Sequence, residues 1–278
     1  MIIRIFFILA LVLSYGFVFT HNYAKTSRHA NTLDLALPVN FYRVAAGYMQ
    51  QLAAEMLFIR TGVFLGGLPP GTPPASYEQA LTNNFEVMTS LYPPFIDPYY
   101  FCHGFLSPIS PEAAANANRI FETGIAAHPD NFFLLMFQGT NYSLSMNDPL
   151  KGAKVFGDAA KIPDAPPLFA HLAALLSAQG GDITAGIVSL RALVATEINE
   201  VVRERYEEEL RMFESALAVQ GAVNDYVREK GVGPPKLEML VPDYLSELPD
   251  FGDQFVLVYD PPVVHLRRPT RKNMKSAL

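Results

Sequence analysis

The sequence has no tryptophan and a single cysteine, Cys102. One cysteine excludes an internal disulfide, and Cys102-His103 does not complete a covalent haem motif because Tyr99 stands where the partner cysteine would be. Charged residues make up only 17% of the 278 residues, whereas 50% of the residues are apolar. A chain of this length and composition has ample core for one large domain or two modest ones.

The sequence also lacks the short motifs that carry common enzyme chemistry. Its six histidines are scattered without the spacing of a metal-binding pair, and it has no nucleophile elbow, phosphate-binding loop or dinucleotide fingerprint. The acidic run at 207–209 is typical of a solvated helix face. We therefore expect a protein that is not an enzyme, with no catalytic, metal-binding or cofactor-binding residues and no cofactor.

Charge is distributed unevenly along the chain. Residues 1–37 hold three basic residues and one acid, and residues 260–278 hold five basic residues and one acid. These ends carry charges of +2 and +4, so the body between them carries −12 and the whole chain −6. An acidic body is poorly suited to nucleic acid, whose phosphates require a basic surface. We expect no nucleic-acid partner, and the basic carboxyl end is typical of a solvated tail.

Residues 5–20 form an uncharged apolar run that follows Arg4. As a helix the run spans about 24 Å, and residues up to Tyr23 would extend it toward the roughly 30 Å hydrocarbon core of a bilayer. The run is typical either of a signal peptide that is removed or of an uncleaved signal anchor. We favour the anchor, since no Ala-x-Ala site follows the run. The predicted location is the inner membrane, crossed once, with the body exported to the periplasmic side.

Three prolines, Pro93, Pro129 and Pro163, recur at spacings of 36 and 34 residues, and their surroundings recur with them. Eight residues before each proline stands an apolar residue, and ten or eleven residues after it a very small one: Phe85, Phe121 and Val155, then Gly104, Gly139 and Ala173. A period near 34, with a small residue where helices cross and a proline where the second helix stops, predicts stacked helical hairpins. The expected helices cover 39–66, 76–91, 97–106, 111–128, 130–146, 149–162, 164–180, a segment from 182, and 197–230. Asp-Pro, Ser-Pro or Asp starts support most of these boundaries.

Between residues 76 and 199 the pattern resembles the tetratricopeptide repeat family. The matching positions are Tyr100, Gly104, Phe121 and Pro129; Leu135, Gly139, Tyr142, Val155 and Pro163; and Phe169 and Ala173. The chain departs from the family pattern in having no tryptophan, only some of the alanines and one extra residue in the first unit. The resemblance implies an all-α, right-handed stack of helical hairpins whose first helices line a concave groove and whose second helices form the outer wall.

Two of the predicted first helices carry no charge, since neither 99–111 nor 131–147 contains Asp, Glu, Lys or Arg. By the family geometry, the residues that would face the groove are Phe101, Phe105, Phe133, Met136 and Thr140. A groove of this kind suits an apolar helix or an extended hydrophobic peptide. Alternatively, the groove closes on itself or on the apolar helix at 39–66.

The last segment changes character. Residues 236–248 predict one or two short helices, and the apolar runs 255–259 and 263–266 flank Asp260-Pro261-Pro262, which predicts a β-hairpin. The stretch 248–252 ahead of a strand resembles the carboxy-terminal pattern of pseudopilins and related envelope proteins.

These patterns predict four parts: a signal anchor at 1–23, a linker at 24–38, a helical domain at 39–235, and a short helix, hairpin and basic tail at 236–278. The function we expect is that of a membrane-anchored, exported scaffold that binds protein partners during assembly of a bacterial envelope machine, with a type IV pilus or secretion system favoured. Two alternatives remain: a module that binds an apolar small molecule or lipid, and a cell-wall enzyme whose pocket is built from residues distant in sequence.

Overall fold

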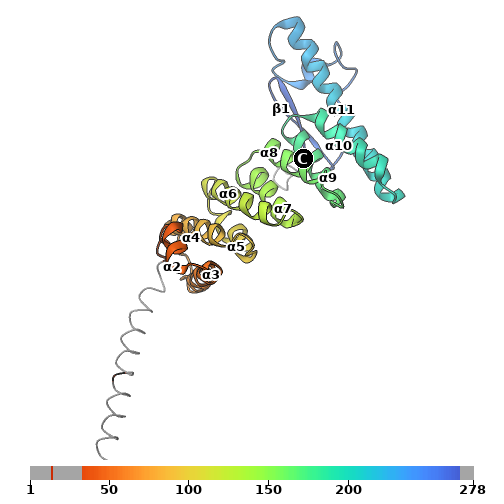
Figure 1. Cartoon of the computed structure of the whole chain (residues 1–278). Helices are drawn as coiled ribbons and strands as arrows, with labels where there is room; N and C mark the ends of the chain where they lie inside the picture. Colours follow the sequence, from red (N-terminus) through yellow and green to blue (C-terminus); the bar gives the residue numbers. More distant parts are fainter. Residues whose placement is uncertain (1–13, 15–32, 270–278) are drawn as a thin grey trace, which may run out of the picture. The chain divides into compact units, whose positions relative to one another are not determined.

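The structure is a computed structural model that describes residues 33–269 together with Ser14. Residues 33–269 form ten α-helices, α2 to α11, several 3-10 or π-helical turns, and one two-stranded antiparallel sheet near the carboxyl end (Figure 1). The predictions of a mostly helical chain and of a carboxy-terminal hairpin are thereby confirmed. The chain divides into two compact units, residues 1–128 and 129–278. The predicted anchor at 1–23, the linker up to residue 32 and the end of the basic tail lie outside the described residues.

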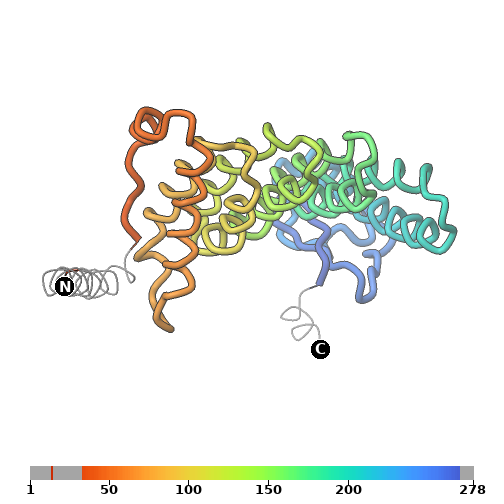
Figure 2. Tube along the Cα trace, turned by 60° about the horizontal axis from the view of Figure 1, so that its bottom comes forward, coloured from red at the N-terminus to blue at the C-terminus, as the bar shows by residue number. Residues whose placement is uncertain are grey.

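The first unit is built around α4. Its helices are α2 (Val39–Ala46), α3 (Gln50–Gly66), α4 (Glu78–Leu91), α5 (Asp97–Phe101) and α6 (Pro111–Ala127). Helix α4 packs against all of the other four, and it is fully buried along the stripe formed by Leu81, Phe85 and Met88. These residues recur at the spacing of one helical face. The tube in Figure 2 shows α3 and α4 running side by side.

The prediction of one helix over residues 39–66 is wrong. The chain turns at Gly47, whose φ of 53° and ψ of −112° lie outside the helical region, and α3 begins three residues later. Residues that carry a β-carbon rarely adopt this backbone conformation, so glycine permits the turn. The alanine-rich composition on both sides of Gly47 concealed the break.

The second unit stacks its helices in chain order. These are α7 (Phe132–Thr140), α8 (Pro149–Ala159), α9 (Pro167–Gln179), α10 (Ile183–Thr196) and α11 (Glu200–Lys230). Each packs against the next along the chain. A cluster around Phe156 and Phe169 fills the space between α8 and α9, and a larger cluster around Phe213 joins α10 and α11 to the hairpin.

Polar side chains cap the starts of five of the ten helices in residues 33–269. Ser110, Asp148 and Asp182 each accept a hydrogen bond from the backbone N–H three residues later, at 2.9, 3.0 and 2.9 Å, as the sequence predicted. Asp130 was expected to open the following helix, but Asn131 caps α7 instead, because its Oδ1 accepts from the N–H of Phe133. Helices α5 and α7 each continue into a five-residue π-helical turn, Cys102–Leu106 and Asn141–Ser145.

The hairpin consists of β1 (Val256–Asp260) and β2 (Val263–Arg267), with Val258 opposite His265. It is held on the helices by Gln220 of α11, whose Oε1 accepts from the N–H of Val264 at 2.7 Å and whose Nε2 donates to the carbonyl of Pro262 at 3.1 Å. Upstream, the predicted helices at 236–248 reduce to one 3-10 turn at Leu237–Leu240.

Candidate functional site

The five predicted groove residues divide between the two units, with two in the first and three in the second. In the first unit, the ring of Phe101 is half-buried between Phe58 of α3 and Phe105, with centroid distances of 4.7 and 5.4 Å. Phe58 of α3 therefore covers part of Phe101. Phe105 stays 45% exposed.

In the second unit, Phe133 is the most open of the predicted residues, with 63% of its surface exposed. Met136 is half-buried and packs against the cluster around Phe156 and Phe169, so its side chain contributes to the core. Thr140 is half-buried at the end of α7. Of the five predicted groove residues, Phe105 and Phe133 are therefore the apolar ones exposed enough to contact a partner.

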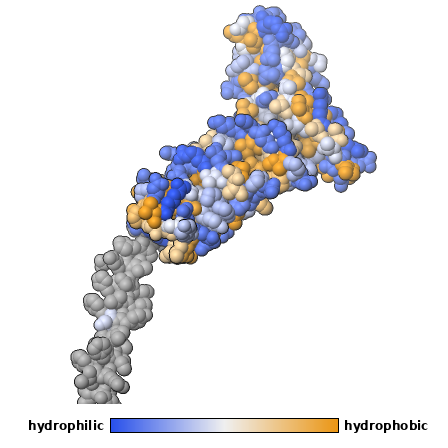
Figure 3. Space-filling view, viewed as in Figure 1, coloured by the Kyte–Doolittle hydropathy of each residue, from blue (hydrophilic) through white to orange (hydrophobic). Residues whose placement is uncertain are grey.

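A second apolar surface lies on α2, α3 and the turn between them. Its members are exposed by 50% or more: Phe41, Val44, Tyr48, Met49, Leu52, Met56, Ile59 and Val63. In Figure 3, apolar residues reach the surface at the end of the first unit that carries these helices. Exposed apolar patches of this kind mark interaction sites in soluble proteins.

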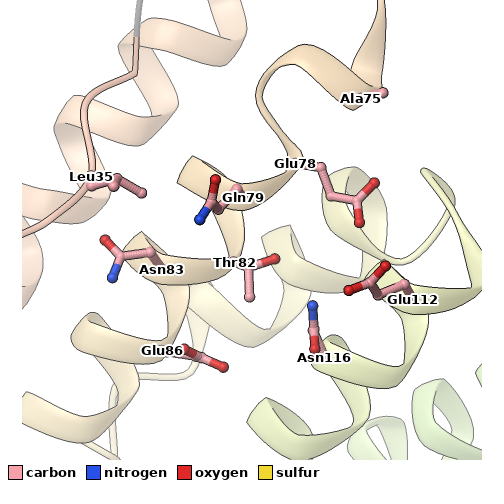
Figure 4. A pocket seen from close by; sticks show the side chains of 9 residues that line it. All are labelled: Leu35, Ala75, Glu78, Gln79, Thr82, Asn83, Glu86, Glu112 and Asn116. Carbon is pink, nitrogen blue, oxygen red and sulfur yellow. The ribbon is translucent and has the colours of Figure 1, made fainter.

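A polar cleft of about 630 Å³ opens between α4 and α6 in the first unit (Figure 4). It is lined by Leu35, Ala75, Glu78, Gln79, Thr82, Asn83, Glu86, Glu112 and Asn116. The spacing of Glu78, Thr82 and Glu86 puts them on one face of α4, and Glu112 and Asn116 share a face of α6. Those i,i+4 pairs are the sequence signal that could have indicated the cleft, but nothing local shows that the two faces meet.

The polar groups of this cleft are only partly paired. Glu78 accepts from the Ser110 hydroxyl at 3.0 Å, and Glu86 pairs with Arg119 at 3.2 Å. Thr82 is 9% exposed, and among the described residues its hydroxyl has no hydrogen-bond partner. Other buried threonines behave differently, because Thr61 and Thr89 donate to the carbonyl four residues earlier. In Figure 4 the Thr82 hydroxyl points from α4 toward α6.

The Oδ1 atom of Asn83 is likewise buried without a partner among residues 33–269. A buried acceptor without a donor costs free energy, so such atoms indicate a place where a donor from outside the chain would bind. The cleft thus combines three carboxylates with unpaired amide and hydroxyl oxygens. This is the chemistry that receives a cationic, multiply donating group.

A buried charge cluster in the second unit joins α9, α11 and the end of the hairpin. Glu209, 1% exposed, accepts from His171 Nε2 at 2.6 Å and pairs through its other oxygen with Arg268, whose guanidinium stacks over the ring of Phe255 at 4.3 Å. Burial raises the pKa of Glu209, but the hydrogen bond and charge of His171, together with Arg268, outweigh it and hold the pKa below its usual value of 4.5. The cluster carries structure, because its groups satisfy one another around the buried Glu209, while Arg268 stays partly exposed. The expectation of a solvated face at 207–209 is therefore wrong for Glu209, which is 1% exposed.

The described residues contain neither a metal site nor a membrane-spanning helix. No set of three or more His, Cys, Asp or Glu side chains in 33–269 is arranged to hold a metal ion. In the same part of the chain, no helix has both the length and the apolar character needed to cross a bilayer.

Comparison of the chain with protein-family models, curated proteins and solved structures finds no match. The proposals that follow therefore rest on the chain's own residues.

Proposed function

We propose that this chain is a non-enzymatic, membrane-anchored scaffold of the tetratricopeptide-like class, exported to the periplasmic face and binding protein partners during assembly of a bacterial envelope machine. A type IV pilus or secretion system is the favoured machine. The observation that carries the proposal is the exposure of Phe105 and Phe133, by 45% and 63%, within segments 99–111 and 131–147, which contain no Asp, Glu, Lys or Arg. Exposed phenylalanines in an uncharged setting are suited to an apolar segment of another protein.

The local packing supports the repeat part of this proposal. Gly139 lies where α7 and α8 approach closely, and Ala173 is buried between α8 and α9. These are two of the three positions that the 34-residue period assigned to helix crossings. The third, Gly104, does not lie at a close approach, because a β-carbon there meets no atom within 4 Å. The amino-terminal apolar run 5–20 supports the membrane anchor.

Crosslinking in native membranes tests the scaffold function. Partners would be recovered with the full chain after crosslinking, and the variants Phe105→Asp and Phe133→Asp should each reduce that recovery about tenfold, the loss expected for one central apolar contact. Val188→Asp is the matched control, because Val188 is 64% exposed on α10 in the same unit as Phe133. Equal recovery by all of these variants would reject the two phenylalanines as the binding surface.

A second candidate function is favoured by the unpaired Thr82 hydroxyl. The lining of the α4–α6 cleft is too polar for an apolar ligand, and its three carboxylates suit an arginine or lysine side chain of a partner polypeptide. An arginine-containing tripeptide blocked at both ends should bind the full chain, and the double variant Glu78→Gln with Glu112→Gln should abolish that binding. Glu122→Gln, an exposed change on α6, is the control. Binding that persists in the double variant would exclude the cleft.

A further inference from the structure

Helix α3 is apolar on two nearly opposite faces. At about 100° per residue, its buried positions fall on one side and its exposed apolar positions on the other. The buried positions are Ala54, Leu57, Thr61 and Phe64. The exposed positions, which we name the outer stripe, are Leu52, Met56, Ile59 and Val63, and they are exposed by 50, 64, 63 and 63%. A helix that is apolar all round is normally covered all round. The first unit leaves the outer stripe exposed, so we expect something outside the unit to cover it.

Exposed apolar side chains continue from the outer stripe into the preceding turn and α2. Met49 and Tyr48 stand at the turn made by Gly47, and Tyr48 has lost none of its accessible surface. Val44 and Phe41 follow on α2, exposed by 85 and 54%. A tyrosine beside long aliphatic side chains is the composition of a membrane-surface segment, where the ring lies at the level of the headgroups.

Charges around this surface are few and balanced. Residues 35–54 contain no Asp or Glu, and the single charged residue in that range is Arg43; beyond it, Asp34 pairs with Arg60 of α3 at 2.9 Å. The carboxylate nearest the outer stripe, Glu55, is bonded by Gln51 at 2.8 Å. Acidic groups gather instead in the α4–α6 cleft. Anionic headgroups would repel carboxylates, so their scarcity on α2 and the first turns of α3 favours lipid contact.

The chain itself brings this surface to a bilayer. The apolar run ends at Thr20, and the twelve residues 21–32 lead to Leu33. Fully extended, they reach about 40 Å, and a relaxed segment of that length keeps the ends much closer. If the run is the anchor, the outer stripe is held near the membrane at high effective concentration, and its insertion needs little further free energy.

We propose that α2 and α3 lie on the membrane surface, with the outer stripe in the headgroup and upper acyl region of the lipids. This inference rests on the proposed membrane anchor, and it adds a second, interfacial attachment to that anchor. The other possible covers are residues 5–20 of the same chain and a second copy of the chain, and the experiment below separates them from lipid.

The test uses the full chain in vesicles of phosphatidylethanolamine and phosphatidylglycerol. A single cysteine replaces Met56 in the outer stripe or, as a control, Glu122 on the exposed side of α6, and each is labelled with an environment-sensitive fluorophore. Cys102 is fully buried and stays in place, with the unsubstituted chain as the labelling blank. Lipids that carry a doxyl quencher near the headgroup should reduce the emission at position 56 at least about twofold more than at position 122.

A charge on the stripe provides the second arm. With the label at Leu52→Cys, the added change Ile59→Asp should remove the quenching. The chain should still float with the vesicles, because its anchor is intact. Unchanged circular dichroism is expected, since Ile59 is 63% exposed.

Each remaining outcome overturns the proposal in a distinguishable way. A chain that floats but shows no quenching at position 56 keeps its anchor and loses the interfacial contact. A label that is blue-shifted but unquenched shows that protein rather than lipid covers the outer stripe. If the spectrum depends on the ratio of protein to vesicle, a second copy of the chain is the cover. If the spectrum does not depend on that ratio, residues 5–20 are the cover. A chain that does not float overturns both the anchor and the surface contact.

Discussion

The ring of Phe156 occupies the space where a β-carbon on Gly139 would stand: an ideal β-carbon built there lies 2.5 Å from the Cζ of Phe156. Phe156 is 2% exposed and packed against Phe169, so it has little room to move. We expect Gly139→Ala to destabilise the protein by about 1–3 kcal/mol through overpacking. Thermal unfolding of the full chain in detergent, followed by circular dichroism, measures the loss.

Gly104 provides the matched control for this change. It holds the corresponding position in the preceding repeat of the sequence pattern, but a β-carbon there meets no atom within 4 Å. Gly104→Ala should be neutral or stabilising by up to about 1 kcal/mol, because alanine restricts the unfolded chain. Equal losses at both positions would contradict a close contact specific to α7 and α8.

Glu209 holds together three parts of the second unit, since it bonds His171 of α9 and Arg268 beyond β2 from its own place on α11. Glu209→Ala should cost about 1.5–3 kcal/mol of unfolding free energy, the value of a hydrogen bond to a buried charged group. Glu204→Ala, an exposed change on the same helix, should cost less than about 0.5 kcal/mol. If the two variants unfold at the same urea concentration, the cluster adds nothing to stability.

The lowered pKa of Glu209 predicts a pH dependence with a definite sign. Because the folded pKa lies below the usual value of 4.5, the stabilisation is fully present above about pH 4.5 and is lost as the pH falls through the folded pKa. Glu209→Gln removes this titration, so its stability should fall less steeply than that of the unsubstituted chain below pH 4.5. Urea unfolding of both proteins at pH 7, 5, 4 and 3 makes the comparison, and parallel curves would contradict the prediction.

The hairpin should depend on Gln220, which bonds both the Val264 amide and the Pro262 carbonyl. Val264 is fully buried, so Gln220→Ala leaves its N–H without a partner at a cost of about 1–3 kcal/mol. Hydrogen exchange at residues 256–267 should accelerate in this variant. Gln254→Ala, which removes an exposed bond to Glu208, should leave exchange in the hairpin unchanged.

The starts of α6, α8 and α10 and the hairpin were predictable because their signals are local. The starts expected at Asp97, Asp130 and Asp164 were less exact, because none of these side chains caps its helix. A side chain at Ser110, Asp148 or Asp182 reaches a backbone N–H three residues away, whatever the rest of the chain does. The turn at Gly47 was missed, since one glycine in an alanine-rich helix pattern changes the periodicity very little. The π-helical turns after α5 and α7 have no sequence signal that we recognise.

The candidate sites were less predictable, because they depend on which helices meet. Phe105 and Phe133 were predicted as exposed groove residues and are exposed, but the covering of Phe101 by Phe58 joins residues 43 positions apart. The cleft likewise joins two helix faces about 30 residues apart in sequence, Thr82 on one and Glu112 on the other. Composition alone could not show which side of α3 the first unit would cover.

The two apolar sides of α3 give this helix two kinds of mutational sensitivity. A charge introduced at Leu57 enters the protein interior, so cells should clear the misfolded product and its abundance should fall. A charge at Ile59 stays outside the core of the first unit, so the amount of protein should hold while the proposed contact of the outer stripe with lipid is lost. A survey of all substitutions along α3, scored for abundance and for function in parallel, would therefore yield two profiles offset by about half a helical turn.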